Sequence, residues 1–337
     1  MTPNNHKNNQ TRRRDLIDRK IIYELDLDAR IPITQLAKKL RQPRETINYR
    51  IARLVQDGII RKFVTMIDTA KLGYSVYKMY FKFQNIDKKT EEEAIAWLTQ
   101  NKYIYWVATA KGKWDLNITI FANNINHFDE IMSGFITRYG QYIQEQEFNT
   151  TLSVGIMSKD WILPEQKKYS KIVTFGSKVI DTKIDHTDVE ILRILANNAR
   201  MPAMAIARKI KSTQKIVIYR MKQLEEKGII LGYTTSLDLE KLDMQFFKAT
   251  IALNTLQPRI RTKIIEYCRN NPHIGFLIFC VGTWPLELEL IVKNNTQFYA
   301  VMDELRQSIP EIRGYDTMIF PKEYKFDWMP LCYEAER

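Results

Sequence analysis

The order of hydrophobic and polar positions predicts three short helices near the start of the chain. Residues 18–28 carry apolar side chains at helical spacing, and residues 34–40 do so after a proline that suits a first helical turn. A third helix is expected over 43–57, where Gly58 supplies the usual C-terminal glycine. Residues 60–67 are then extended, as a wing would be. Three helices, the last two joined by a tight turn, predict a winged helix-turn-helix.

Beyond this segment the apolar positions alternate, which indicates strands. The resulting order β-α-β-β-α-β is that of a ferredoxin-like fold. One face of such a sheet carries its helices, while the other face is rich in aromatic residues here and needs a cover, so we expect two sheets to pair back to back. The predicted strands are 75–84, 104–109, 116–121 and 142–151, and the predicted helices are 91–100 and 125–139.

The whole pattern occurs twice, 170 residues apart. Asp18 aligns with Asp188, and Ala29-Arg30 aligns with Ala199-Arg200; residues 18–60 contain 14 identities in 43 positions without a gap. A match of this length indicates a duplicated and fused unit, so both halves are expected to fold alike. In the second half this predicts strands near 246–253, 274–280, 286–292 and 312–320, and helices near 258–271 and 295–308.

The fold class is therefore α+β, with two repeats of a winged helix-turn-helix followed by a ferredoxin-like βαββαβ module. The polar stretch around Gly176 and Ser177 joins the repeats. The expected domains are a basic flexible arm at 1–17, winged helix-turn-helix 1 at 18–68, ferredoxin-like sensing and oligomerisation domain 1 at 69–166, a linker at 167–183, winged helix-turn-helix 2 at 184–238, ferredoxin-like domain 2 at 239–330 and a tail at 331–337.

The formal net charge of +12 is concentrated in two blocks. Residues 1–62 hold 15 Lys and Arg against 7 Asp and Glu, and residues 183–232 hold 10 against 5. Residues 63–170 are balanced, with 12 of each sign. Clustered cations are the electrostatic signature of a polyanion partner, so both helix-turn-helix segments are expected to bind double-stranded DNA. The alternative is a generally basic surface that serves solubility.

Other function classes leave little trace in the sequence. The most apolar window, residues 274–292, is interrupted by Glu287, Glu289 and a turn, which suits buried strands and not a membrane helix. No export signal is evident, and the three cysteines lack metal or redox spacing, so we expect a cytoplasmic protein. The four histidines form no cluster in the sequence, and no phosphate loop or nucleophile elbow is present. We expect no catalytic residue, no metal and no cofactor.

A helix-turn-helix leading into a βαββαβ module resembles the Lrp/AsnC (feast/famine) regulators, here in a tandem fused form. The matching segments are Asp18-Arg-Lys-Ile-Ile-Tyr-Glu-Leu, Leu36-Ala-Lys-Lys-Leu and the run from Glu45 to Ile60. The resemblance implies a sequence-specific transcriptional regulator whose second module, of RAM type, oligomerises and binds a small effector such as an amino acid. A fused chain could close the usual dimer within itself, as an intramolecular pseudo-dimer, or assemble into a higher homo-oligomer.

The two predicted recognition helices differ. The first presents Thr46 and Asn48, whereas the second has Ile216 and Ile218 at the same positions. We interpret the first head as the main sequence reader and the second as relying on phosphates or thymine methyls. Two alternatives stay open: the isoleucines pack under a neighbouring element, and the arginine-rich arm is only a solvated charge run. The expected DNA-binding residues are Arg12, Arg13, Arg14, Arg41, Gln42, Arg44, Glu45, Thr46, Asn48, Tyr49, Arg53, Lys211, Ser212, Gln214, Lys215, Tyr219 and Lys222.

Two further expectations come from the resemblance. The turn before each recognition helix holds Arg41 or Lys211 where the family usually has a glycine with positive φ. The turn after the second sensing strand is where the family places effector contacts; it reads Lys-Gly-Lys-Trp-Asp in the first repeat, and the copy lacks the carboxylate. The expected effector-binding residues are Lys111, Gly112, Asp115 and Gly282.

Two rival functions share this architecture. Sirohaem decarboxylases also combine two such repeats, but the corresponding strands here read Trp-Asp-Leu-Asn-Ile-Thr and Trp-Pro-Leu-Glu-Leu-Glu, and the histidines are scattered. An amino-acid-binding oligomer without a DNA function would leave the two cation blocks unexplained. Both rivals are weaker than the regulator.

Overall fold

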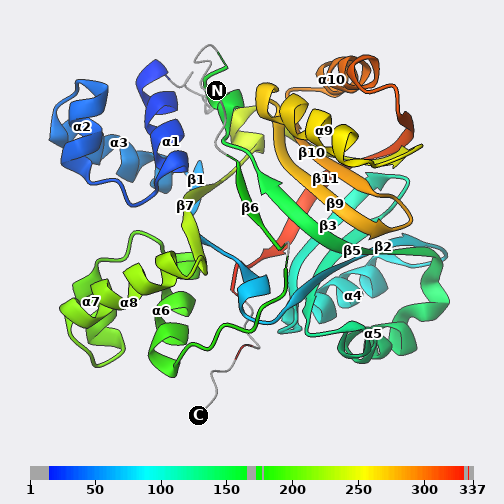
Figure 1. Cartoon of the computed structure of the whole chain (residues 1–337), viewed down its shortest axis with the longest axis horizontal. Coiled ribbons are helices and arrows are strands. Elements are labelled where there is room, and N and C mark those ends of the chain that lie inside the picture. Colours follow the sequence, from blue (N-terminus) through cyan, green and yellow to red (C-terminus); the bar gives the residue numbers. More distant parts are fainter. Residues whose placement is uncertain (1–14, 165–171, 177, 330–332, 334–337) are drawn as a thin grey trace, which may run out of the picture.

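The chain forms two helical heads beside a β-barrel (Figure 1). The computed structural model describes residues 15–164, 172–176, 178–329 and 333. Within these residues no helix is long and apolar enough to cross a membrane. The predicted α+β class and its division into two like repeats are confirmed.

The first head is a three-helix unit, and the second head repeats it. Asp15 caps the first helix by accepting a hydrogen bond from the Asp18 amide, and Asp185 does the same for Asp188. Gly58 follows the third helix with φ of 68°, a left-handed conformation that glycine adopts without strain. The helices are α1 (Leu16–Leu27), α2 (Ile33–Leu40) and α3 (Arg44–Gln56), then α6 (His186–Asn197), α7 (Ala203–Lys209) and α8 (Gln214–Glu226).

The extended segment after each head pairs with its counterpart. Strands β1 (Ile60–Ile67) and β7 (Ile230–Leu237) form a two-stranded antiparallel sheet between the heads. Their register is symmetric about the pair Val64 and Thr234, which stand 170 residues apart. The strand predicted as a wing is thus extended as expected, but its backbone hydrogen bonds go to the other repeat.

The eight sensing strands close into one barrel. Each repeat supplies a four-stranded ferredoxin-like sheet, and the two sheets join at both edges, where β5 pairs with β9 and β11 pairs with β3. The prediction that the two sheets pack back to back was therefore incomplete, because it did not include the hydrogen bonds that join their edges. The strands are β2 (Ser75–Phe83), β3 (Ile104–Gly112), β4 (Leu116–Ala122), β5 (Ile143–Ile156), β8 (Gln245–Leu253), β9 (Ile274–Gly282), β10 (Leu286–Val292) and β11 (Ile312–Phe326).

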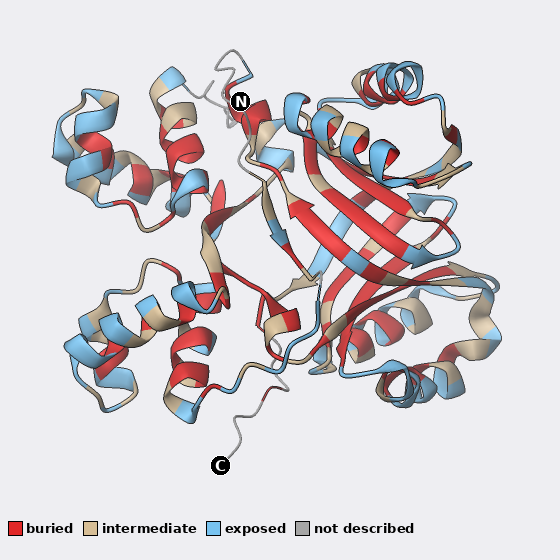
Figure 2. Ribbon diagram, in the orientation of Figure 1, coloured by how far each residue is buried: buried red, intermediate tan, exposed pale blue. Residues whose placement is uncertain are grey.

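Helices cover the outside of the barrel, and aromatic residues fill part of its interior. Helices α4 (Lys88–Gln100) and α5 (Ile125–Tyr139) pack on the first sheet, and α9 (Pro258–Asn270) and α10 (Asn295–Ser308) on the second. Figure 2 shows the barrel strands largely buried and the helices exposed on their outer sides. The short elements are β6 (Val173–Phe175), η1 (Thr69–Lys71), η2 (Gly140–Tyr142), η3 (Asp160–Ile162) and η4 (Glu240–Leu242). Strand β6 lies within the predicted linker and pairs with β5.

A buried aspartate ties the recognition helix to the first helix in each head. Asp18 is 2% exposed and contacts both Arg50, at 2.9 Å, and Arg53. Its counterpart Asp188 has only Arg220, at 3.4 Å, because Gln223 replaces the second arginine. Burial, with the nearby Asp185, raises the pKa of Asp188 above its ordinary value. The same carboxylate is therefore well neutralised in the first head and poorly neutralised in the second.

We predict that Asp18→Asn lowers the free energy of unfolding by about 3 kcal/mol, because it leaves two arginines without their buried partner. The matched Asp188→Asn should cost less than about 1 kcal/mol, since the folded state already disfavours that charge. Because the pKa of Asp188 is raised in the folded state, its protonated form favours folding. Its contribution to the free energy of unfolding therefore declines as the pH rises through the folded-state pKa. Chemical denaturation at neutral pH measures both variants. Equal losses would contradict the prediction.

Candidate nucleic-acid interface

The exposed side of α3 carries polar groups suited to base edges and phosphates. Arg44, Glu45, Asn48 and Tyr49 are exposed there, while Ile47, Ile51 and Leu54 are buried in the core of the head. Tyr49 is 66% exposed on this face. Gln42 and Thr46 are half-buried at the start of the same surface. The structure thus brings the predicted residues of this helix to one face.

Helix α8 presents a more apolar version of the same face. Ile216 and Ile218 are 44% and 52% exposed, so the alternative that they pack under a neighbouring element is wrong. Tyr219 is 60% exposed beside them. Met204 on α7, which was not among the predicted residues, is also exposed and stands where the first head has Thr34. The predicted polar residues Gln214, Lys215 and Lys222 are exposed as well, and Ser212 is half-buried.

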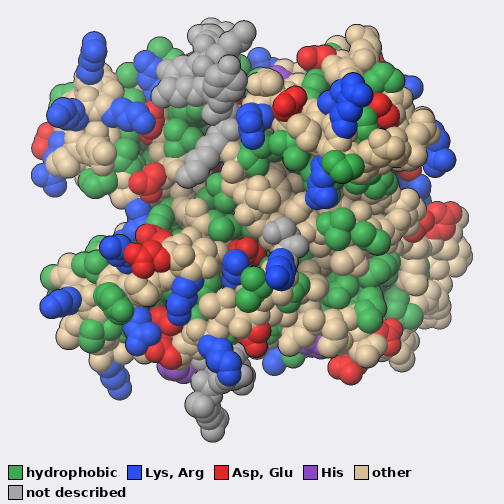
Figure 3. All heavy atoms as spheres, viewed as in Figure 1, with side chains coloured by type: hydrophobic (Ala, Val, Ile, Leu, Met, Phe, Trp, Pro, Cys, Tyr) green, Lys and Arg blue, Asp and Glu red, His purple; other side chains and the backbone are tan. Residues whose placement is uncertain are grey.

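Both turns before the recognition helices adopt the left-handed conformation that the resemblance implied. Arg41 and Lys211 each have φ of 52°. A side chain in this region costs on the order of 1 kcal/mol relative to glycine, and both side chains are exposed. Each position therefore places a cation beside the recognition helix. Both heads carry projecting Lys and Arg side chains on their surface (Figure 3).

Arg53 points to Asp18 and connects α3 with α1, so its guanidinium is already engaged within the head. Arg12, Arg13 and Arg14 lie outside the described residues.

The heads are held against each other by reciprocal contacts that the sequence analysis did not assign. Arg30 of the first head donates to the carbonyl oxygens of Ala199 and Met201 in the second. Arg200 donates in return to Ala29, at 2.5 Å, and to Ile31, at 3.4 Å. Burial, with the neighbouring Arg30, lowers the pKa of Arg200 below its ordinary value. The identity of Ala29-Arg30 with Ala199-Arg200 could have indicated this junction, because each arginine donates hydrogen bonds to the other repeat.

Aromatic rings and backbone hydrogen bonds complete this junction. Arg30 lies 5.4 Å from the centre of the Tyr233 ring, and Arg200 lies 5.4 Å from that of Phe63. The amides of Ala29 and Ala199 donate to the carbonyl oxygens of the same two aromatic residues. The β1–β7 sheet and the two arginines therefore fix how one recognition helix lies relative to the other.

The predicted effector turn lies at the seam of the barrel. The Asp115 carboxylate accepts hydrogen bonds from Lys82, at 3.0 Å, and from the Phe83 amide, at 2.9 Å, so both oxygens have partners within the module. A Cβ at Gly112 would lie 2.4 Å from a backbone oxygen of β11, and one at Gly282 would lie 2.6 Å from a backbone oxygen of β5. Lys111 faces β11 in the ladder. These glycines permit the close approach of the two repeats.

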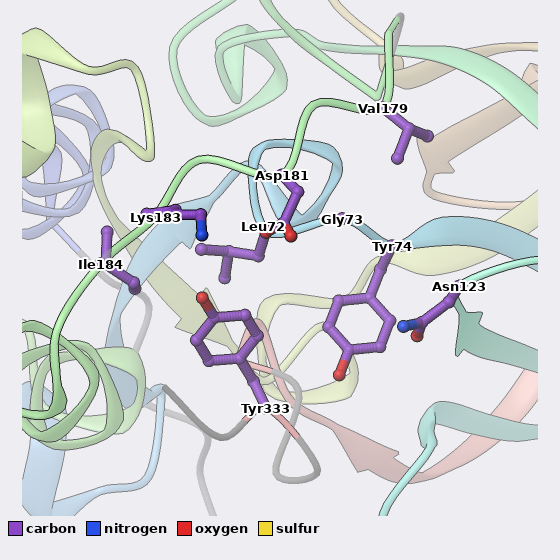
Figure 4. A pocket seen from close by; sticks show the side chains of 9 residues that line it. All are labelled: Leu72, Gly73, Tyr74, Asn123, Val179, Asp181, Lys183, Ile184 and Tyr333. Atoms are coloured by element: carbon purple, nitrogen blue, oxygen red, sulfur yellow. The ribbon is translucent and has the colours of Figure 1, made fainter. Parts of the chain in front are cut away.

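A cavity of about 300 Å³ lies elsewhere, between the linker and the first sensing module. Figure 4 shows the rings of Tyr74 and Tyr333 next to each other at the cavity, with Asp181 and Lys183 contributed by the linker. Asn123, which follows β4, completes the polar lining. The cavity therefore offers both charges and two phenol rings where the linker enters the second head. The described residues contain no group of His, Cys, Asp and Glu arranged to hold a metal ion.

Comparisons with known proteins agree with this geometry. A family model described as a winged helix-turn-helix DNA-binding domain matches residues 14–61, and that of the AsnC-type helix-turn-helix domain matches residues 184–225. An HTH-type transcriptional regulator of Pyrococcus horikoshii is 33% identical over 119 residues, which are 35% of this chain and 79% of that protein. Transcriptional regulator AzlB of Bacillus subtilis is 30% identical over 140 residues, or 40% of this chain and 87% of that protein.

Two helix-turn-helix heads with exposed, cation-bearing recognition helices define a DNA-binding transcriptional regulator. The chain belongs to the Lrp/AsnC family, in a form that carries two repeats of the family's unit.

A solved structure shares the fused architecture. The siroheme decarboxylase NirDL superposes with a TM-score of 0.60 over 92% of both chains, at 14% sequence identity. At this identity the likeness extends to the fold alone.

We predict that Arg30→Met and Arg200→Met weaken binding to DNA with two half-sites about tenfold, while binding to a single half-site is unchanged. The reason is that each variant loosens the contacts that hold the two heads in one arrangement, and a looser arrangement lowers the effective concentration of the second head. Fluorescence anisotropy with both probes measures the effect. Equal weakening on both probes would show that the arginines act within one head instead.

Proposed function

We propose that one chain acts as a complete two-headed regulator, which binds two half-sites of double-stranded DNA in a sequence-specific manner. The observation that carries this proposal is the fixed junction of the heads through Arg30, Arg200 and the β1–β7 sheet. Single-unit binders need two chains to present two recognition helices at a set spacing. Here the covalent connection and the closed barrel supply that spacing within one polypeptide.

We also propose that the heads contribute unequally. Arg44, Asn48 and Thr46 offer donors and acceptors for base edges, whereas Ile216, Ile218 and Met204 offer only apolar contact. Such an apolar face suits thymine methyl groups, and the flanking Lys211 and Lys215 suit phosphates. The first head then provides most of the sequence discrimination, and the second provides affinity and position.

The test compares Arg44→Ala with the matched Gln214→Ala on one operator fragment. Selected binding sites from random DNA supply that operator. We expect Arg44→Ala to lower specific affinity by about tenfold to a hundredfold and Gln214→Ala by no more than about threefold, because a base-edge contact is worth about 1–3 kcal/mol. Lys89→Ala, on the exposed surface of α4, serves as the control and should leave binding unchanged. Equal losses from the two head variants would refute the asymmetry.

We also propose that the chain catalyses no reaction. Support comes from the barrel interior, where Trp106, Trp114 and Trp284 pack with the strands, and from the concentration of cations on the heads. The rival reading, a decarboxylase on the same scaffold, requires an iron tetrapyrrole to bind. Gel shifts at two salt concentrations and absorbance titration with iron uroporphyrin separate them: retardation that weakens with salt and no absorbance change support the regulator.

For the effector, we propose the cavity beside the linker in place of the turn at residues 111–115. The cavity supports this proposal because Asp181 and Lys183 give its lining one charge of each sign. A small molecule with one ammonium and one carboxylate group matches this lining, which agrees with the amino acids that the family resemblance implies. Because the linker continues into α6, occupancy there would act on the second head.

We predict that an amino acid found by a thermal-shift screen loses at least tenfold in affinity on Asp181→Asn, because the ammonium then lacks its counter-charge. Lys111→Ala, which removes an exposed charge from the other candidate site, should leave the affinity unchanged. Isothermal titration calorimetry measures both. A loss of affinity confined to Lys111→Ala would place the effector site at the turn instead.

A further inference from the structure

The barrel interior contains four charged side chains that neither DNA nor effector binding uses. On the barrel strands of the described chain, the buried charged residues are Lys78, Lys248, Glu287 and Glu289. Lys78 Nζ lies 2.6 Å from Glu287 Oε2, across the boundary between the repeats. Lys248 Nζ lies 3.5 Å from the same oxygen and 3.1 Å from Glu289 Oε1. We call these four residues the charge cluster.

Polar and aromatic groups surround the charge cluster. Tyr80 and Trp284 donate hydrogen bonds of 2.6 and 3.0 Å to Glu287 Oε1. Lys248 donates to Asn117 Oδ1 at 2.9 Å and lies 4.9 Å from the centre of the Trp106 ring. The remaining titratable groups that face the cluster are Tyr105, Cys280 and Glu323.

The two repeats contribute unequal charge to this interior. Lys78 and Lys248 occupy equivalent positions, 170 residues apart. Glu287 and Glu289, in contrast, stand where the first repeat has Asn117 and Thr119. The first repeat therefore supplies one net positive charge and the second supplies one net negative charge. Trp114 shows the same imbalance: its Nε1 has no hydrogen-bond partner, whereas that of its counterpart Trp284 binds Glu287.

We propose that the charge cluster is a pairing code that lets the barrel close only between one first repeat and one second repeat. Two first repeats would bury two lysines without a carboxylate. Two second repeats would bury two lysines with four carboxylates. Only a barrel made of one first and one second repeat has a neutral interior. The inner surface of each repeat is therefore complementary in charge to the opposite repeat and not to a copy of itself.

The physical basis is the cost of burying a charge without a counter-charge. Burial opposes the charge on Glu287, but Lys78 and Lys248 outweigh it and hold the pKa of this carboxyl well below its usual range. Burial likewise opposes the charge on Lys78, and Glu287 holds its pKa above the ordinary value. Removing one partner of such a pair is strongly destabilising, whereas removing both can be neutral. A pairing of two like repeats leaves buried charges without a counter-charge, so it is destabilising in the same way as the removal of one partner.

The code has a consequence for assembly. Each repeat of this chain could in principle close a barrel with the same repeat of another copy, which would link chains together. The cluster disfavours both products of like repeats, so charge favours the mixed pair, and the covalent connection favours forming that pair within one chain. The partner that the code accepts is an opposite repeat, in this chain or in a second copy of it.

Variants of the full-length chain can imitate each pairing. Glu287→Asn with Glu289→Thr gives the interior of two first repeats, and Asn117→Glu with Thr119→Glu gives that of two second repeats. Each double variant should lower the folding equilibrium constant roughly a hundredfold or more, as expected for an unpaired buried charge. The quadruple variant moves both carboxylates to the first repeat and restores neutrality, so it should regain most of the lost stability. Asp316→Asn, which breaks the exposed cross-repeat pair with Lys113, is the control and should change little.

The pH dependence gives a second, independent readout. Unpaired buried lysines have a lowered folded pKa, so the first double variant should gain stability relative to the native chain as the pH rises. Excess buried carboxylates have a raised folded pKa, so the second should gain stability as the pH falls. Where a double variant does not fold at neutral pH, Lys78→Met, Glu287→Gln and their combination form a double-mutant cycle with smaller changes. The combination should be more stable than either single change. Additive losses of stability, both in this cycle and in the quadruple variant, would overturn the proposal, as would pH responses of the same sign in the two double variants.

Discussion

The closure of the barrel at two edges is the constraint on which the rest of the structure depends. A four-stranded sheet on its own leaves two unpaired edges and an aromatic face that needs cover. Pairing β5 with β9 and β11 with β3 removes both problems at once and brings the two repeats into a near-symmetric arrangement. The β1–β7 sheet continues that symmetry to the heads, where Arg30 and Arg200 complete it. The positions of the recognition helices thus follow from hydrogen bonds made far from DNA.

The symmetry of the framework coexists with asymmetry in the side chains that carry chemistry. Asp18 has two arginines and Asp188 has one; α3 exposes amide and guanidinium groups, and α8 exposes isoleucines. The barrel interior follows the same division, with both carboxylates in the second repeat. Fusion permits this divergence, because a residue of one repeat always meets the other repeat and never its own copy. In a dimer of single-unit chains both subunits carry the same residues, so the two halves cannot differ in net charge.

Much of the fold was predictable from the sequence because its patterns are local. Helical and alternating periodicity predicted the helices and strands with ends that mostly differ by a few residues, and the offset of 170 residues predicted the repeat. The left-handed turns at Arg41 and Lys211 also followed from the resemblance. The pairing of the two sheets along their edges could not be predicted, because nothing in the sequence of a single strand specifies which distant strand it pairs with. The candidate recognition residues were located by pattern, but the engagement of Arg53 with Asp18 and of Asp115 with Lys82 depends on tertiary contacts.

We propose that a single chain presents both recognition helices to DNA, fixed by closure within the polypeptide. The most direct test is the mass of the free protein and of its complex with a two-half-site operator, measured by sedimentation equilibrium across a range of concentrations. We expect a free species of 39.9 kDa and a complex that contains one chain per operator. A free species of twice that mass, or a complex with one chain on each half-site, would contradict it.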